Sequence, residues 1–218
     1  PASYSAVDSL TFLFDFGMSL QNANFKENDV KTNAKNSTID YIAMQFRLWE
    51  RMGMTVGFLP YSIVGYNMNQ VKSISTDEYG NPINSLSTYS GDGSLQQVFM
   101  GLGFKVLESL SVGANFSYLY GDITHSVNTT FSNTNAYSSV RSEKMEISDY
   151  KLDFGLQYTQ KKSKKHKINL GAVYSFGHDL NGNGYNLKET YQSGSTIPMT
   201  QTVDTLKNAF SLPHSFGV

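Results

Sequence analysis

The sequence of 218 residues contains no cysteine, which excludes a disulfide framework and a thiolate metal site. Charged residues are scarce, at 16%, and nearly cancel to a formal net charge of −1, so no overall field would attract nucleic acid. No segment approaches the roughly 18 consecutive apolar residues that a transmembrane helix requires. Aromatic residues are plentiful instead, with 14 Tyr and 14 Phe, which argues against a disordered chain.

Apolar and polar residues alternate along five long segments of the chain. The segments are residues 10–20, 98–106, 110–120, 150–158 and 168–176. Within the third, Val112, Ala114 and Phe116 occupy one phase, while Gly113 and Asn115 occupy the other. A period of two predicts β-strands, because a helix would scatter each apolar set around its circumference.

The strands of a soluble β-sandwich also alternate between apolar and polar residues, so this fold is the alternative to a membrane protein. The runs here last about 9 to 12 residues, as a tilted strand needs to cross a bilayer, whereas soluble strands usually have about 5 to 6. Gly, Ser and Asn fill the polar phase, as in a wet lumen, and Tyr gathers at the ends of the runs. Outer-membrane barrels carry such aromatic girdles. The pattern therefore predicts an all-β, antiparallel transmembrane β-barrel.

The phase of each run predicts which side chains face lipid and which face the lumen. The residues expected to face lipid are Phe14, Leu102, Phe116, Phe154 and Leu170. The polar residues expected in the lumen are Asp15, Arg47, Lys105, Asn115, Lys151, Asp153 and Asn169. Because an unpaired charge in a narrow lumen is costly, we expect most of these charges to have an opposite charge or water within reach.

Short and long connections alternate along the chain, as the periplasmic turns and outer loops of such barrels do. The short ones lie near Trp49, Glu108, Lys162 and Pro213. The long ones are predicted after Leu20, over 70–94, over 125–144 and after His178. This spacing gives about eight strands before SFGV opens a ninth. Since an open edge in lipid is costly, we expect residues 1–218 to be part of a single outer-membrane β-barrel domain.

The segment GFLPYSIVGYN carries a proline inside a predicted strand. Proline cannot donate to a β-ladder, and the apolar phase changes across Pro60, as it does at a β-bulge. One interpretation is a structural kink without a role. The other is a lateral opening in the wall for a ligand, lined by Phe58, Pro60, Tyr61 and Ile63.

Other motifs point to no chemistry. DLNGNGYN from Asp179 matches half of a calcium loop, but Thr190 stands where the bidentate Glu belongs. The lysines over 161–167 are interpreted as a solvated turn. The four histidines have no partners at metal-ligand spacing. We therefore expect no enzymatic activity, no metal and no cofactor.

Three short motifs resemble the outer-membrane long-chain fatty-acid transporter family (FadL type). They are Pro1-Ala2 before the first strand, Gly57 with Pro60-Tyr61-Ser62 in the third, and Leu212-Pro213 near the end. The Tyr/Asn-rich loops and many lysines look like members from Bacteroidetes. The resemblance implies a barrel of about fourteen strands, with the N-terminal hatch and C-terminal strands absent from this chain.

The resemblance implies passive uptake of hydrophobic, fatty-acid-like small molecules across the bacterial outer membrane, with lateral exit at the kinked third strand. The expected partners are membrane lipids and a hydrophobic ligand. The alternative is a non-transporting barrel, a structural or scaffolding subunit that binds partner proteins through its extracellular loops. An apolar pocket inside the barrel would favour transport, and a lumen filled by side chains would favour the scaffold.

Overall fold

The computed structural model describes residues 1–8, 11–27, 30–76, 78–133, 135–163, 166–192, 195–207 and 210–218. These residues form one short 3-10 helix, η1 (Ala2–Ala6), and twelve strands. The strands are β1 (Phe12–Glu27), β2 (Val30–Trp49), β3 (Met52–Thr76), β4 (Pro82–Leu107), β5 (Leu110–Phe131), β6 (Tyr137–Ser163), β7 (His166–Ser175), β8 (His178–Leu180), β9 (Gly182–Gln192), β10 (Thr200–Lys207), β11 (Phe210–Leu212) and β12 (Ser215–Gly217). Within the described ranges, no helix is both long and apolar enough to span a membrane.

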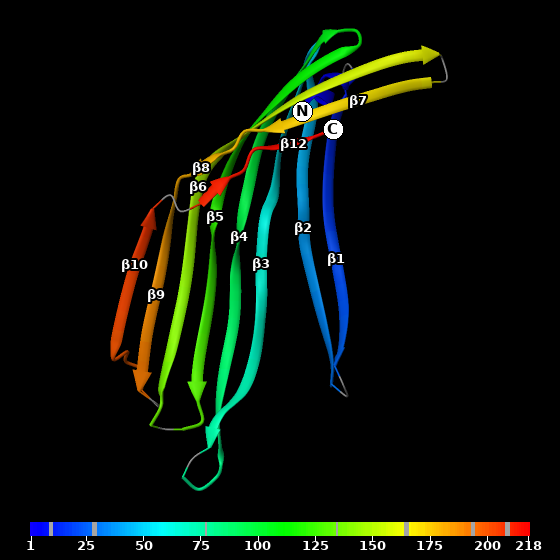
Figure 1. Cartoon of the computed structure of the whole chain (residues 1–218). Coiled ribbons are helices and arrows are strands. Elements are labelled where there is room, and N and C mark those ends of the chain that lie inside the picture. Colours follow the sequence, from blue (N-terminus) through cyan, green and yellow to red (C-terminus); the bar gives the residue numbers. More distant parts are fainter. Residues whose placement is uncertain are drawn as a thin grey trace.

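The strands form one large antiparallel sheet in the order β1-β2-β3-β4-β5-β6-β7-β12. The first half of β6 pairs with β9 and its second half with β7, and β10 pairs with β9. β8 and β11 leave the large sheet and form a sheet of two. The β1–β2 hairpin lies at one side and β9–β10 at the other (Figure 1). The all-β antiparallel prediction is confirmed, whereas the described strands form an open sheet; the closed barrel of about fourteen strands stays a prediction.

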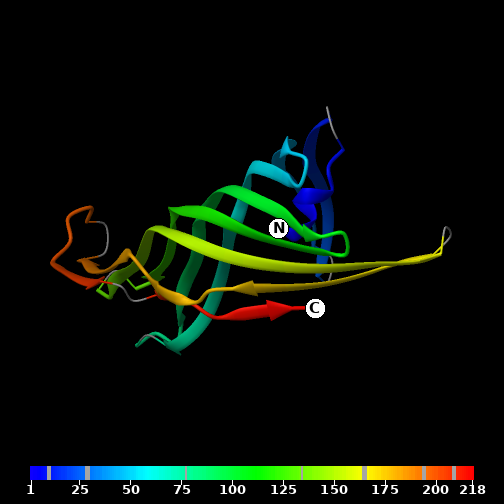
Figure 2. The same cartoon turned by 90° about the horizontal axis from the view of Figure 1, so that it is seen from above.

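The two faces of the sheet differ in the kind of side chain that each exposes. We call the face that contacts η1 the inner face, and Figure 2 shows the sheet curving around the N-terminal segment. In β5, Phe116 is 51% exposed on the outer face, while the adjacent Ser117 on the inner face is fully buried. A soluble protein buries large apolar groups, and contiguous exposed ones mark a surface that meets lipid or protein.

The predicted long loops are wrong, because strands continue through most of them. The stretch 70–94 is the β3–β4 hairpin, 125–144 belongs largely to β5 and β6, and the region after Leu20 is the β1–β2 hairpin. The stretch after His178 holds β8 and β9, so the long loop predicted there is also wrong: Asp179, Asn183 and Gly184 are strand residues. Polar residues occupy both phases of these hairpins, so the alternation that predicts a strand is lost.

A small apolar core lies on the inner face beyond η1. Its buried residues are Leu95, Leu119, Ile123, Ile147 and Leu180. Val64 and Met145 pack against it, as do Phe210 and Leu212 of the β8–β11 sheet. The two-stranded sheet therefore covers part of the inner face and closes it with apolar side chains.

Candidate functional site

The N-terminal segment docks on the inner face over a set of glycines. A Cβ added to any of them would overlap this segment: Gly53, Gly101, Gly103, Gly113 and Gly155. Ser5 Oγ donates to the carbonyl of Ala2, at 3.0 Å, and lies within hydrogen-bond distance of Ser111 Oγ on β5, at 3.1 Å. From β2, Gln45 Nε2 donates to the Tyr4 carbonyl at 3.3 Å. Because glycine has no side chain, these positions of β3 to β6 let the N-terminal segment lie directly on the strand backbone.

We expect Gly113→Ala to weaken the docking of η1. The new Cβ would lie 2.6 Å from the backbone nitrogen of Ala2, and such overpacking typically costs about 1–3 kcal/mol. The matched control is Gly65→Ala, because a Cβ there meets nothing within 4 Å. A urea titration in detergent, followed by the fluorescence of Trp49, compares the two. Equal unfolding free energies for both variants would contradict the docking.

Lys151 and Asp153 form an ion pair on the inner face of β6. Their side chains are 17% and 10% exposed, and Ser175 Oγ of β7 donates to Asp153 Oδ1 at 2.5 Å. A buried charge pair with an added hydrogen bond is costly to break. Asn115 also lies on this face, with its Oδ1 beside the tyrosine ring of Tyr4 above Gly101.

The other predicted lumen charges lie on β1, β2 and β4. Asp15 Oδ2 accepts a hydrogen bond from the Tyr41 hydroxyl at 3.2 Å. Lys105 pairs with Glu108 at 3.0 Å. The Arg47 guanidinium donates to the carbonyls of Trp49, at 3.0 Å from Nε, and of Glu50. Each of these groups therefore has a protein partner.

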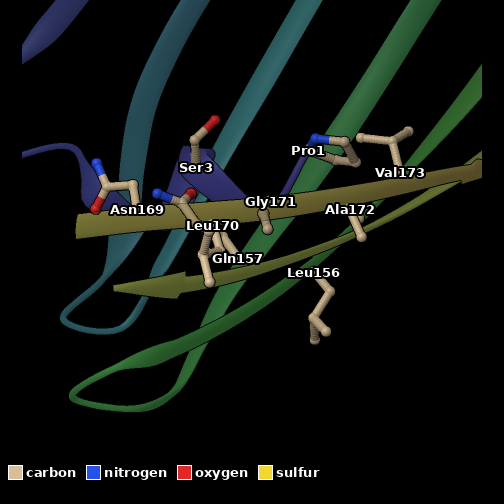
Figure 3. Close-up of a pocket in the computed structure, with 11 residues that line it drawn as sticks. Pro1, Ser3, Leu156, Gln157, Asn169, Leu170, Gly171, Ala172 and Val173 are labelled. Atoms are coloured by element: carbon tan, nitrogen blue, oxygen red, sulfur yellow. The ribbon is translucent and has the colours of Figure 1, made fainter. Parts of the chain in front are cut away.

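Two open cavities border the N-terminal segment. The first, of about 220 Å³, lies between Pro1–Ser3 and the strands β6 and β7 (Figure 3). Gln157, Asn169 and Gly171 are among its lining residues. The second, of about 400 Å³, is lined by charges of both signs, including Arg47, Glu50, Lys105 and Glu108. Neither is an enclosed apolar chamber for a lipid.

For the third strand, the structure confirms the bulge predicted at Pro60, and the lateral opening for a ligand stays a prediction. β3 is one continuous strand, with a register shift against β4 between Pro60 and Ser62. The bulge is therefore present, but the strand is not interrupted. What ends near Pro60 is the ladder with β2, whose last pair is Ile42 with Phe58. Tyr61 and Ile63, beyond that point, are 42% and 54% exposed.

Histidines that looked isolated in the sequence have partners where the chain leaves the sheet after β7. His178 Nε2 lies 3.5 Å from Asp149 Oδ2, and its ring stacks on Tyr150 with centroids 4.5 Å apart. His214 Nδ1 lies 2.7 Å from the Tyr174 hydroxyl and accepts from the Gly177 amide at 3.0 Å. No spacing signal could have revealed these contacts, because the partners come from strands distant in sequence.

No described group of three or more acidic or histidine side chains could hold a metal. In the lysine run, Lys164 and Lys165 fall outside the described residues. Leu10, the first apolar residue of the first predicted run, does so as well.

Taken as a class, the fold is an antiparallel sheet with an apolar outer face and an inner face closed by its own N-terminal segment and apolar core. The chain belongs to the BamG family, whose model matches residues 1–217. No curated protein and no solved structure matches it. The predicted membership of the FadL-type transporter family is therefore wrong, and lipid transport and hydrophobic compound uptake conflict with this family. The motifs behind that resemblance are only two to four residues long.

Proposed function

We propose that the chain is a non-transporting, non-enzymatic component of the bacterial outer membrane that binds partner proteins of the BAM complex. The family name points to this outer-membrane protein machinery. The alternative drawn from the sequence, a scaffolding barrel, thus becomes the leading function. The observation that carries it is the filled inner face, because η1 and the apolar core under β8 and β11 occupy the space that a transported ligand would need.

The outer face supports a membrane position for the sheet. Along β5 the outer phase is apolar from Leu110 to Tyr120. Ten steps of about 3.3 Å at a tilt near 45° give roughly 23 Å, close to the height of about 25 Å that the apolar band has in outer-membrane barrels. The next outer position is Asp122. Beside it, Lys144 Nζ lies 3.8 Å from Asp122 Oδ2 and 2.7 Å from Glu146 Oε1. The hydrogen bond to Glu146 raises the pKa of Lys144, which keeps this ammonium charged, and the cluster marks the polar border of the band.

The strands continue far beyond that border. β3, β4 and β6 have 25, 26 and 27 residues, whereas a tilted strand crosses a bilayer in about 9–11. The β3–β4 tip carries large apolar residues: Met68 (58% exposed), Val71 (66%), Ile74 (57%) and Tyr79 (88%). Apolar groups gathered beyond the band mark a surface for protein contact, so we infer that this tip binds a partner.

The test is co-purification of BAM complex proteins with an affinity-tagged chain from the native cells. We expect the double substitution Val71→Ser with Ile74→Ser to reduce the co-purified proteins several-fold. The amount of chain in the outer membrane should stay unchanged. The control is Val203→Ser with Ile197→Ser, at equally exposed positions near β10.

Equal recovery from both double variants would contradict the role of the tip. Absence of BAM complex proteins from every sample, together with hydrophobic-probe uptake that depends on the chain, would overturn the proposed function itself.

A further inference from the structure

Strands β2 and β3 separate within the wall and leave two free edges facing each other. Their ladder ends at Ile42 and Phe58, yet β2 continues back to Val30 along β1, and β3 continues to Thr76 along β4. Figure 1 shows the β1–β2 hairpin swinging away from β3. We call this gap the notch, bounded by residues 31–41 of β2 and 59–68 of β3.

The closed end of the notch lies at the outer border of the apolar band, because Phe58 is level with Tyr118 across β4 and Ile63 is level with Asp122. Beyond the last pair, Ile39 of β2 and Ile63 of β3 are 46% and 54% exposed, and Leu20, farther along the neighbouring β1, is 73% exposed. At a free strand edge, the unpaired backbone amides and carbonyls are a template for pairing with another strand. Pro60 removes one donor at the vertex, but the strand beyond it stays extended and carries the usual groups. The two edges therefore offer backbone donors and acceptors to a strand of another chain.

The direction of the strands restricts what can fill the notch. β2 and β3 are antiparallel, so a single inserted strand would run antiparallel to one edge and parallel to the other. Two inserted strands joined by a turn restore antiparallel pairing at every step. Antiparallel ladders are also slightly more stable per residue. A hairpin with its turn toward the vertex is thus the insert that fits both edges.

Charge near the mouth of the notch further restricts the partner. Lys26, Lys31 and Lys35 lie on the outer part of the β1–β2 hairpin, and no ion pair is found for them among the described side chains. Lysines on an edge strand discourage indiscriminate pairing, so a matching strand must bring acidic residues. A second copy of this chain that paired through its own β1–β2 hairpin would place the same lysines against these, and like charges repel.

We propose that the notch binds a β-hairpin of a partner outer-membrane protein, with acidic residues at its outer end. The inference rests on the proposed function, because a partner protein must reach the chain in the membrane. It extends that function from contact at the β3–β4 tip to strand pairing within the wall, the mode known as β-augmentation.

The experiment places the photo-cross-linking amino acid benzoylphenylalanine at Ile39 or Ile63 in cells. The control position is Phe116, which is exposed on the outer face of a strand paired on both sides. We expect Ile39 and Ile63 to cross-link to the two arms of one hairpin, identified by peptide mass spectrometry, and Phe116 to give lipid adducts alone. The pair Lys31→Glu with Lys35→Glu should lower the protein adducts several-fold, whereas Lys188→Glu on β9 should not.

Four outcomes would overturn the notch as a hairpin site. They are lipid adducts alone at both positions, adducts to a second copy of the chain, adducts to a different segment of the same chain, and adducts to helical or loop peptides. Co-purified BAM complex proteins are measured in the same cells, so recovery of the complex without hairpin adducts rejects the notch and leaves the proposed function standing. If the Ile63 variant fails to reach the membrane, Tyr61 replaces it, because that side chain is also exposed.

Discussion

The substitution Asp153→Ala should destabilise the folded chain by about 3–5 kcal/mol, the cost of leaving a buried charge without its partner. Asp153 accepts from Lys151 and from Ser175 Oγ, and its side chain is 10% exposed. Removing the carboxylate leaves the Lys151 ammonium desolvated on the inner face. It also removes the acceptor that joins β6 to β7. Urea unfolding in detergent, followed by the fluorescence of the single tryptophan, Trp49, measures the loss.

Two control variants separate the charge effect from simple loss of side-chain volume. Replacing both partners, as Lys151→Met with Asp153→Leu, should restore much of the stability, because apolar replacements of a buried pair are often neutral or better. Lys105→Met breaks a pair that is far more exposed, with Glu108 at 87%, and should cost only about 0–1 kcal/mol. Equal losses for Asp153→Ala and Lys105→Met would show that burial does not strengthen the inner pair.

The period-two pattern was enough to predict the strands inside the apolar band. In residues 110–120 it predicts an apolar outer phase with Phe116 and Tyr118 and a polar inner phase with Asn115 and Ser117. The exposed fractions agree, because the outer pair is exposed and the inner pair is not. Leu119 is the informative exception, an apolar residue in the polar phase. It is fully buried in the inner core with Ile123. An isolated apolar residue in the lumen phase thus indicates a filled interior.

Outside the band the same pattern fails for a physical reason. Neither face of the extended hairpins meets lipid, so nothing selects one whole phase to be apolar, and the β-ladder is held by backbone hydrogen bonds. For this reason the sequence pattern predicts loops over 70–94 and 125–144, where the structure has strands. The contact of His178 with Asp149 is equally invisible, because it depends on which strand comes to lie beside β6.

Pro60 shows which features of the sheet can be predicted from the sequence of one strand alone. The phase change across it predicts the bulge, and the register against β4 does shift there. Whether the neighbouring strand stays paired is decided by β2, whose own sequence gives no such signal. The parting at Ile42 and Phe58 therefore emerges only from the assembled sheet.

The substitution Phe116→Arg should cost about 2–4 kcal/mol, the penalty for a cation at mid-depth on the lipid face of a membrane barrel. Phe116 is 51% exposed on the outer face, between Ala114 and Tyr118, and its ring lies parallel to that of Tyr150 at 6.5 Å. Arginine at this position would place its charge in hydrocarbon and remove the aromatic contact.

Gln157→Arg is the matched control, since an inner-face position that faced water would accept the same charge at little cost. Asn115 is less suitable, because it is packed beside Tyr4, so a longer side chain there would clash and confuse volume with polarity. Gln157 borders the open polar cavity that Glu50 and Glu108 also line, where a guanidinium has both room and acceptors. Folding titrations into lipid vesicles compare the two variants. A similar cost for both would mean that the outer face does not meet lipid, and the exposed aromatic band would then be a protein-binding surface.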